Sequence, residues 1–160
     1  EIMSVIKKLH HNAYRCIDSE ETRKFYEDFL NLKLVKAFNI SNTFTGRNIN
    51  ALHTFYSMND NSYLAFFEIL GDSFKYKKWH DFDLHIALEV DKTSLQKYFH
   101  KGKSLGIETR GISDHGFIES IYFRDPNGYV IELTSPKNIS NLTDEDPHEV
   151  LDTWNSQKNV

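Results

Sequence analysis

The stretch Ile121–Leu133 constrains the fold of this chain most, because it encodes a tight hairpin between two apolar strands. Aromatic and β-branched residues flank Asp-Pro-Asn-Gly at 125–128, where proline fixes φ at the first turn position and glycine accepts the left-handed conformation that ends the turn. This pattern predicts a type I turn followed by a glycine bulge. In that register Tyr122 lies opposite Glu132, so a phenol and a carboxylate share one face of a sheet.

Glu132 stands in the middle of the apolar run Tyr-Val-Ile-Glu-Leu. A carboxylate is costly to bury there unless a positive group pairs with it. Two interpretations follow. Glu132 is either an exposed residue of an edge strand, as most glutamates are solvated, or a metal ligand whose partners lie elsewhere in the chain.

Length and composition exclude several classes of protein. The chain has 160 residues, a formal net charge of −4 with both signs interspersed, and one cysteine, Cys16. This favours one compact domain without disulfides, and gives no electrostatic case for a nucleic-acid partner. No apolar run approaches the roughly 20 residues of a membrane span. A single cysteine and no apolar leader segment favour a cytoplasmic protein.

Hydrophobic spacing predicts the same order of elements twice. The first half predicts a strand over 9–17, a helix over about 20–31, strands over 32–38, 49–56 and 63–69, and a polar loop over 39–48. The second half predicts a strand over 83–90, a helix over about 93–104, a short strand over 106–109, a loop over 111–116 and the two hairpin strands.

The two halves also align at two chemically notable positions. His11-Asn-Ala matches His85-Ile-Ala, and Phe67-Glu68-Ile matches Ile131-Glu132-Leu. We therefore expect an α+β fold of two βαβββ modules, over about 8–70 and 82–135, within one domain of residues 1–136. Residues 137–160 form a polar tail, in which a short helix is expected over 148–157.

Three motifs in this order are similar to those of the vicinal oxygen chelate superfamily, which the chain resembles over residues 8–135. The motifs are His11 followed seven residues later by Asp18, the run His85-Ile-Ala-Leu-Glu-Val, and the run from Tyr122 to Glu132. This superfamily contains glyoxalase I, extradiol ring-cleaving dioxygenases, fosfomycin-resistance thiol transferases and bleomycin-binding proteins. The resemblance implies a curled mixed sheet that forms a cup around a divalent metal.

By position in these motifs, the resemblance implies that His11, His85 and Glu132 are the metal ligands. Two imidazoles and one carboxylate suit Fe(II) and leave positions open for a substrate, although the same donors also hold Mn, Ni, Co or Zn. Members of this kind commonly pair, so the resemblance is also compatible with a homodimer. The expected partner is a small-molecule substrate.

The resemblance leaves the chemistry open between three hypotheses. In the favoured one, an extradiol dioxygenase-like enzyme oxidises a catechol on Fe(II), with Tyr122 stabilising the anionic oxygen and His115 as general acid or base. In the second, Glu68 is a fourth ligand or proton shuttle of a glyoxalase I-like lyase. In the third, the chain is a drug-binding resistance protein without catalysis. Arg15 is an expected anion contact and does not separate these hypotheses.

Overall fold

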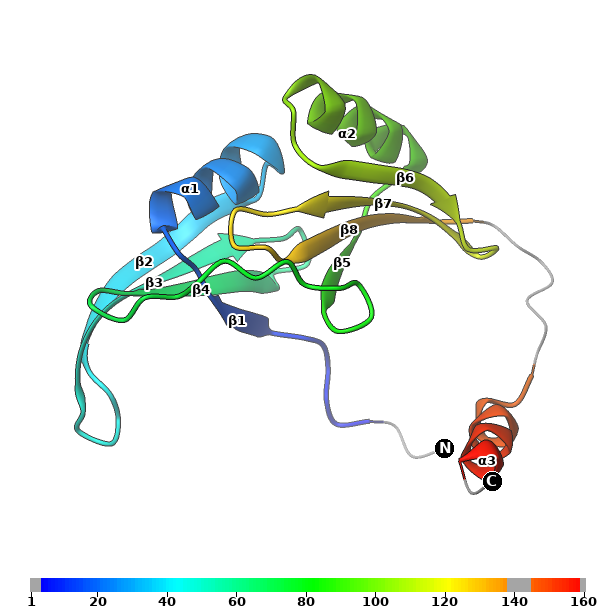
Figure 1. The fold of residues 1–160 in the computed structure, drawn as a ribbon, viewed down its shortest axis with the longest axis horizontal. Helices are drawn as coiled ribbons and strands as arrows, with labels where there is room; N and C mark the ends of the chain where they lie inside the picture. Colours follow the sequence, from blue (N-terminus) through cyan, green and yellow to red (C-terminus); the bar gives the residue numbers. More distant parts are fainter. Residues whose placement is uncertain (1–3, 138–144, 159–160) are drawn as a thin grey trace.

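The computed structural model describes residues 4–137 and 145–158, which contain two four-stranded sheets (Figure 1). The strand order is β1-β4-β3-β2 in the first sheet and β5-β8-β7-β6 in the second. The elements of the first module are β1 (His11–Arg15), α1 (Ser19–Arg23), the π-helical η1 (Lys24–Phe29), β2 (Lys33–Asn42), β3 (Asn48–Ser57) and β4 (Tyr63–Ile69). Those of the second are β5 (His85–Glu89), α2 (Lys92–Ser104), β6 (Thr109–Asp114), β7 (Ile118–Arg124) and β8 (Val130–Pro136). The predicted α+β fold of two βαβββ modules is confirmed.

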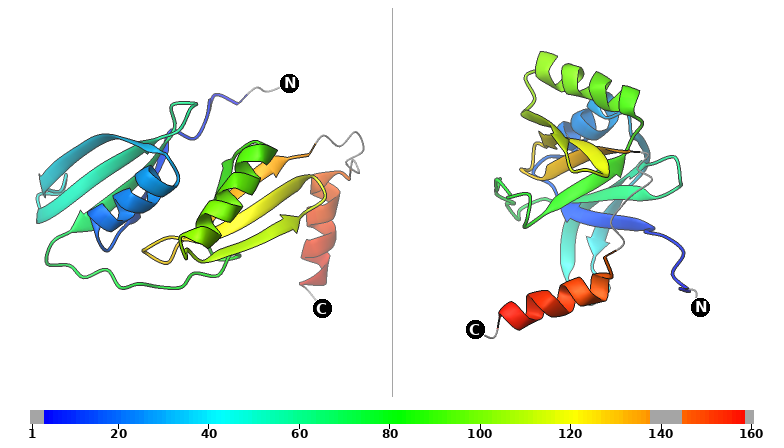
Figure 2. Two further views of the ribbon diagram at one scale, coloured as in Figure 1. Left: turned by 90° about the horizontal axis from the view of Figure 1, so that it is seen from above. Right: turned by 90° about the vertical axis from the view of Figure 1, so that its right-hand side faces the viewer.

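The two modules lie side by side, with α1, η1 and α2 on the same side of the molecule (Figures 1 and 2). The aromatic core lies between these helices and the sheets, where Tyr26 contacts Phe66 and Phe29 contacts Phe123. The opposite surface of each sheet is not covered by a helix of its own module, and we call these surfaces the open faces. Residues on the open faces alternate along each strand with residues of the core.

The hairpin after β7 forms as the sequence predicts. The Asp125 amide donates to the Tyr129 carbonyl at 3.0 Å, and Tyr122 pairs with Glu132 across the two strands. Gly128 has φ of +94°, and a Cβ atom at this position would overlap the carbonyl oxygen of Lys77. Only glycine therefore fits where residues 70–84, the connector between the modules, cross the turn.

The same turn joins the second module to the first through a buried carboxylate. Asp125 is 3% exposed and accepts hydrogen bonds from the backbone amides of Asn127 and Tyr129 and from the Tyr26 hydroxyl at 2.9 Å. Asn127 in turn accepts from the Ile17 amide at 2.8 Å. Burial raises the pKa of the Asp125 carboxyl above its ordinary value, although the donors around it oppose this shift.

Replacing Tyr26 with phenylalanine is expected to lower the free energy of unfolding by about 1–3 kcal/mol, because the buried Asp125 carboxylate loses a donor. A carboxyl whose pKa is raised in the folded state makes the protein less stable as pH rises through that pKa. Loss of the Tyr26 donor raises the pKa of Asp125 further. The deficit should therefore be larger at pH 7 than at pH 4 in urea denaturation. Tyr98→Phe is the control, since the Tyr98 hydroxyl donates to the Leu30 carbonyl; an equal pH dependence in both variants would contradict the assignment.

Two segments expected to be loops are partly strands. β2 continues to Asn42, because Asn42 pairs with Asn48 at the start of β3 and the polar residues form an extended hairpin. β6 runs from Thr109 to Asp114, where the expectation was a loop from 111 onward. A register shift between Gly111 and Ser113 keeps this strand paired with β7.

The expected C-terminal helix is present as α3 (Pro147–Gln157), begun by Asp146, whose carboxylate accepts from the His148 amide. It lies apart from the two sheets (Figure 1), and its apolar residues Val150, Leu151 and Trp154 are about half exposed. Among the described residues, none of the helices combines the length and apolar character needed to cross a bilayer.

Candidate metal and substrate site

Glu132 and His85 meet on the open face of the second sheet. His85 begins β5 and Glu132 lies in the neighbouring β8, with Nε2 of His85 3.3 Å from Oε2 of Glu132. β8 is flanked by β5 and β7, so the interpretation of Glu132 as an exposed edge-strand residue is wrong; its side chain is 7% exposed. A carboxylate that is nearly buried on a central strand needs a positive partner.

The imidazole of His85 is oriented by the connector that precedes it. Its Nδ1 lies 2.7 Å from the carbonyl oxygen of Asp81. Because a carbonyl only accepts, Nδ1 donates, and Nε2 is directed toward Glu132 with either a proton or a lone pair. With a lone pair on Nε2, the two acceptors 3.3 Å apart would repel each other unless a proton or a cation lay between them. An imidazole nitrogen and a carboxylate oxygen are also donors that divalent cations take. The backbone contact to Nδ1 is the kind that orients metal-binding histidines.

Tyr122 extends this pair into a chain of polar contacts. Its hydroxyl lies 3.4 Å from Oε1 of Glu132 and 2.8 Å from Nε2 of His115. Burial raises the pKa of Tyr122, and the charge of Glu132 raises it further. Four residues singled out from the sequence are thus brought together, in the order His85, Glu132, Tyr122 and His115.

Two further residues support this cluster and were not expected. Arg110 donates to both carboxylate oxygens of Asp81, at 2.8 and 2.7 Å, and its guanidinium lies over the Tyr122 ring, 5.1 Å from the centroid. Asp81 therefore holds His85 through its carbonyl and Arg110 through its carboxylate. Arg110 was missed because the short strand expected here ended at Thr109, before the pairing of Arg110 with Tyr122.

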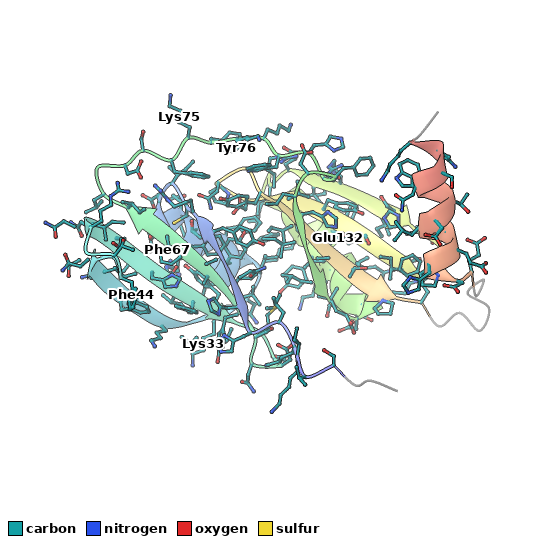
Figure 3. The ribbon with its side chains drawn as sticks, turned by 90° about the horizontal axis from the view of Figure 1, so that it is seen from below. Lys33, Phe44, Phe67, Lys75, Tyr76 and Glu132 are labelled. Carbon is teal, nitrogen blue, oxygen red and sulfur yellow. The ribbon has the colours of Figure 1, made fainter. Side chains whose placement is uncertain are left out.

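His11 lies on the first sheet and does not join this cluster within one chain. Over the described ranges 4–137 and 145–158, no three His, Cys, Asp or Glu side chains are placed so that they could hold a metal ion together. His11 starts β1 on the open face of the first sheet, which also carries Phe67. Figure 3 shows Phe67 and Glu132 on separate sheets, viewed from the side of the open faces. His11 is exposed, and its Nδ1 lies 2.8 Å from that of His10.

Glu68 lies on the opposite side of the first sheet. It pairs with Leu52 on the core face, and its carboxylate accepts from the Ser19 amide at 2.7 Å, at the start of α1. The alignment of Glu68 with Glu132 is corrected by the strand pairing: His85 is paired with Val130 and His11 with Tyr63, so the position equivalent to Glu132 is Ala65. The observation that favoured a fourth ligand at Glu68 is thereby removed.

Arg15 is engaged with the connector between the modules. Its guanidinium donates to the Asp72 carboxylate at 3.3 Å and to the Asp72 carbonyl at 2.9 Å, and lies over the Phe74 ring. It stands at the far end of β1 from His11. The structure therefore places Arg15 in a contact within the protein, and not beside His85 and Glu132.

The fold is shared with solved proteins of low sequence identity. A mutant form of FosX, a fosfomycin resistance protein from Listeria monocytogenes, complexed with Mn(II) and 1S,2S-dihydroxypropylphosphonic acid, is 22% identical with a TM-score of 0.60, covering 84% of this chain and 96% of that one. A glyoxylase/bleomycin resistance protein/dioxygenase domain from Frankia sp. EAN1pec is 14% identical with a TM-score of 0.66, covering 82% and 99%. TnmS3, an antibiotic binding protein from Streptomyces sp. CB03234, is 15% identical with a TM-score of 0.60, covering 84% and 100%.

The comparison with sequence families agrees with these structural neighbours. No curated protein matches the chain. The sequence model described as the Glyoxalase/Bleomycin resistance protein/Dioxygenase superfamily matches residues 8–133, which run from just before β1 into β8 and so include both modules. The chain therefore belongs to the glyoxalase/bleomycin resistance protein/dioxygenase superfamily.

Proposed function

We propose that this chain is a divalent-metal enzyme in which His85 and Glu132 of one copy and His11 of a second copy hold the ion. The contact between His85 and Glu132 supports the first part, because the two acceptors need a cation or proton between them. The placement of His11 on the open face of the other sheet supports the second part. A homodimer can bring the first module of one copy against the second module of the other, and two-fold symmetry then forms the site twice.

We further propose that the substrate is a small catechol and that the reaction is an extradiol dioxygenase-like oxidation. The observation that carries this proposal is the contact of the Tyr122 hydroxyl with both His115, at 2.8 Å, and Glu132, at 3.4 Å. A bound Fe(II) would supply adjacent positions for two vicinal hydroxyl oxygens and for dioxygen.

The residues of the chain have distinct tasks in this proposal. The Tyr122 hydroxyl can donate a hydrogen bond to a substrate oxygen that becomes anionic beside Glu132. Nε2 of His115 lies 2.8 Å from the Tyr122 hydroxyl, so with its lone pair there it can take a proton from that hydroxyl and return it. Arg110 holds the Tyr122 ring and is itself fixed by Asp81.

A drug-binding protein is the second candidate, favoured by the likeness of the fold to the antibiotic binding protein TnmS3. The glyoxalase I-like alternative has less support, because Glu68 faces α1. Metal content separates the drug-binding candidate from the enzyme, and substrates separate the two enzymes.

Anaerobically purified protein loaded with Fe(II) is expected to consume oxygen when catechols are added, measured with an oxygen electrode. Tyr122→Phe should lower the rate by about 100-fold, since a positioned acid or base contributes about 10²–10⁴-fold. The panel should include fosfomycin with a thiol and the methylglyoxal–thiol hemithioacetal with Ni(II) or Zn(II). Hemithioacetal turnover without oxygen uptake would replace the dioxygenase proposal by the lyase.

A further inference from the structure

The open face of the first sheet is lined by rings, in contrast to the charged and polar open face of the second. Strand pairing places six ring-bearing residues on this surface, which we call the aromatic face: His11, Phe38, His53, Phe55, Tyr63 and Phe67. The His53 ring stacks on the Phe67 ring with centroids 3.7 Å apart and planes at 11°. Phe38 stacks on Phe55 at 6.2 Å. Flat apolar faces of this kind suit a planar ring.

His53 is the one member of the aromatic face that is both buried and fixed by the backbone. It is 7% exposed, and its Nδ1 lies 2.9 Å from the carbonyl oxygen of Phe66. Since that carbonyl accepts, Nδ1 donates and Nε2 of the neutral ring is an acceptor. Burial lowers the pKa of His53, which favours this neutral form at pH 7. Some side-chain atoms of the described residues are fully buried and have no hydrogen-bond partner, but Nε2 of His53 is not one of them. This atom is therefore not sealed inside the sheet without a partner.

The distance from His53 to His11 is spanned by one ring. Phe55 lies 4.3 Å from the His53 ring and 5.6 Å from the His11 ring, centroid to centroid. All three residues belong to one sheet, so whichever copy supplies His11 to a metal also supplies Phe55 and His53. A small ring bound to that metal could stack on Phe55, and its far edge would then lie on the side of His53.

We propose that His53 is a specificity-determining residue, whose Nε2 accepts a hydrogen bond from a hydroxyl substituent of an aromatic substrate lying on the aromatic face. This inference rests on the proposed function, because the metal bound by His11 is what places the ring. It adds a requirement that the metal ligands do not impose: the substrate ring should carry a donor beyond the two oxygens that bind the metal. Phe67 acts as a positioning residue, because its stacked ring fixes the plane of the imidazole.

The test compares chelators that differ only in the ring or in its substituents. Anaerobic Mn(II)-loaded protein is titrated by calorimetry with catechol, 1,2,3-trihydroxybenzene, 1,2,4-trihydroxybenzene and acetohydroxamic acid, which binds metal through two oxygens without a ring. We expect one trihydroxybenzene to bind about tenfold more tightly than catechol, which corresponds to about 1.4 kcal/mol and lies within the range of one hydrogen bond. His53→Phe keeps a ring for Phe67 and should reduce this preference to within about twofold.

One control variant and one control ligand separate recognition from folding. His53→Gln retains an acceptor near Nε2 and should keep most of the preference, while acetohydroxamic acid should bind equally to all variants. The inference is overturned if the wild type has no preference, or if His53→Phe retains it. A wild-type protein that binds no Mn(II) would remove the proposed function and this inference together, whereas normal Mn(II) binding without ring selectivity removes this inference alone.

Discussion

Glu132→Gln is expected to lower the affinity for Mn(II) or Fe(II) by more than about 100-fold, since loss of an outer partner of a ligand alone costs about 10–100-fold. Glutamine keeps the size of the side chain and removes the charge that faces Nε2 of His85 at 3.3 Å. Metal analysis of the wild-type protein should find about one divalent ion per chain, because each chain supplies one set of the three ligands. The variant should contain almost none, and His85→Ala should behave in the same way.

Glu68→Gln is the matched control, because Glu68 is also a strand glutamate but its carboxylate accepts from the Ser19 amide at the start of α1. Its metal content should equal that of the wild type, while its stability falls slightly. Metal loss in Glu68→Gln would restore the four-ligand site and the lyase hypothesis. Unchanged metal content in both His85→Ala and Glu132→Gln would refute the assignment of the site.

The second large effect concerns the assembly. His11→Ala and His85→Ala should each abolish metal binding as homodimers, whereas a heterodimer of the two should regain one intact site. The reason is that His11 of the His85→Ala copy can meet His85 and Glu132 of the His11→Ala copy, while the other site lacks both imidazoles. Co-expression with two different tags and purification through both yields this heterodimer, in which we expect about one metal ion per dimer.

The outcomes of this experiment discriminate between ways of building the site. Metal retained by the His11→Ala homodimer would show that His11 is not a ligand. A heterodimer without metal would show that the ligands are not shared between copies. The apparent mass of the wild type in solution, measured by light scattering, should be that of a dimer of two 18.8 kDa chains.

Local sequence was sufficient where a short-range rule fixes the geometry. The turn residues at 125–128 predicted the pairing of Tyr122 with Glu132, because the turn type sets the register of the strands it joins. No such rule was available for Glu68, because β1 and β4 are parallel strands that no turn connects. Their register therefore cannot be derived from the number of residues between them. A shift of three residues places Ala65 where Glu68 was aligned and turns Glu68 to the other face.

Strand limits were predicted less well where polar residues take part in pairing. The Asn- and Ser-rich end of β2 and the segment Gly111–Asp114 of β6 are strands because neighbouring strands supply hydrogen bonds, although neither segment has the apolar alternation typical of a half-buried strand. Arg110 and Asp81 were missed for a related reason. Their contact with each other and with the cluster around His85 joins positions that are 29 residues apart.

The sequence by itself determined the order of the elements, the two modules and the hairpin, because hydrophobic spacing and turn chemistry act over a few residues. His85 and Glu132 became candidate ligands through the resemblance of their motifs to those of the superfamily. The tertiary structure decided which face each side chain occupies and which side chains meet, because strand register and packing depend on contacts between distant segments. It also placed His11 on a different sheet from His85 and Glu132, because the strands of each module pair only with one another. Packing between modules, or between copies, is therefore what decides whether the two open faces meet.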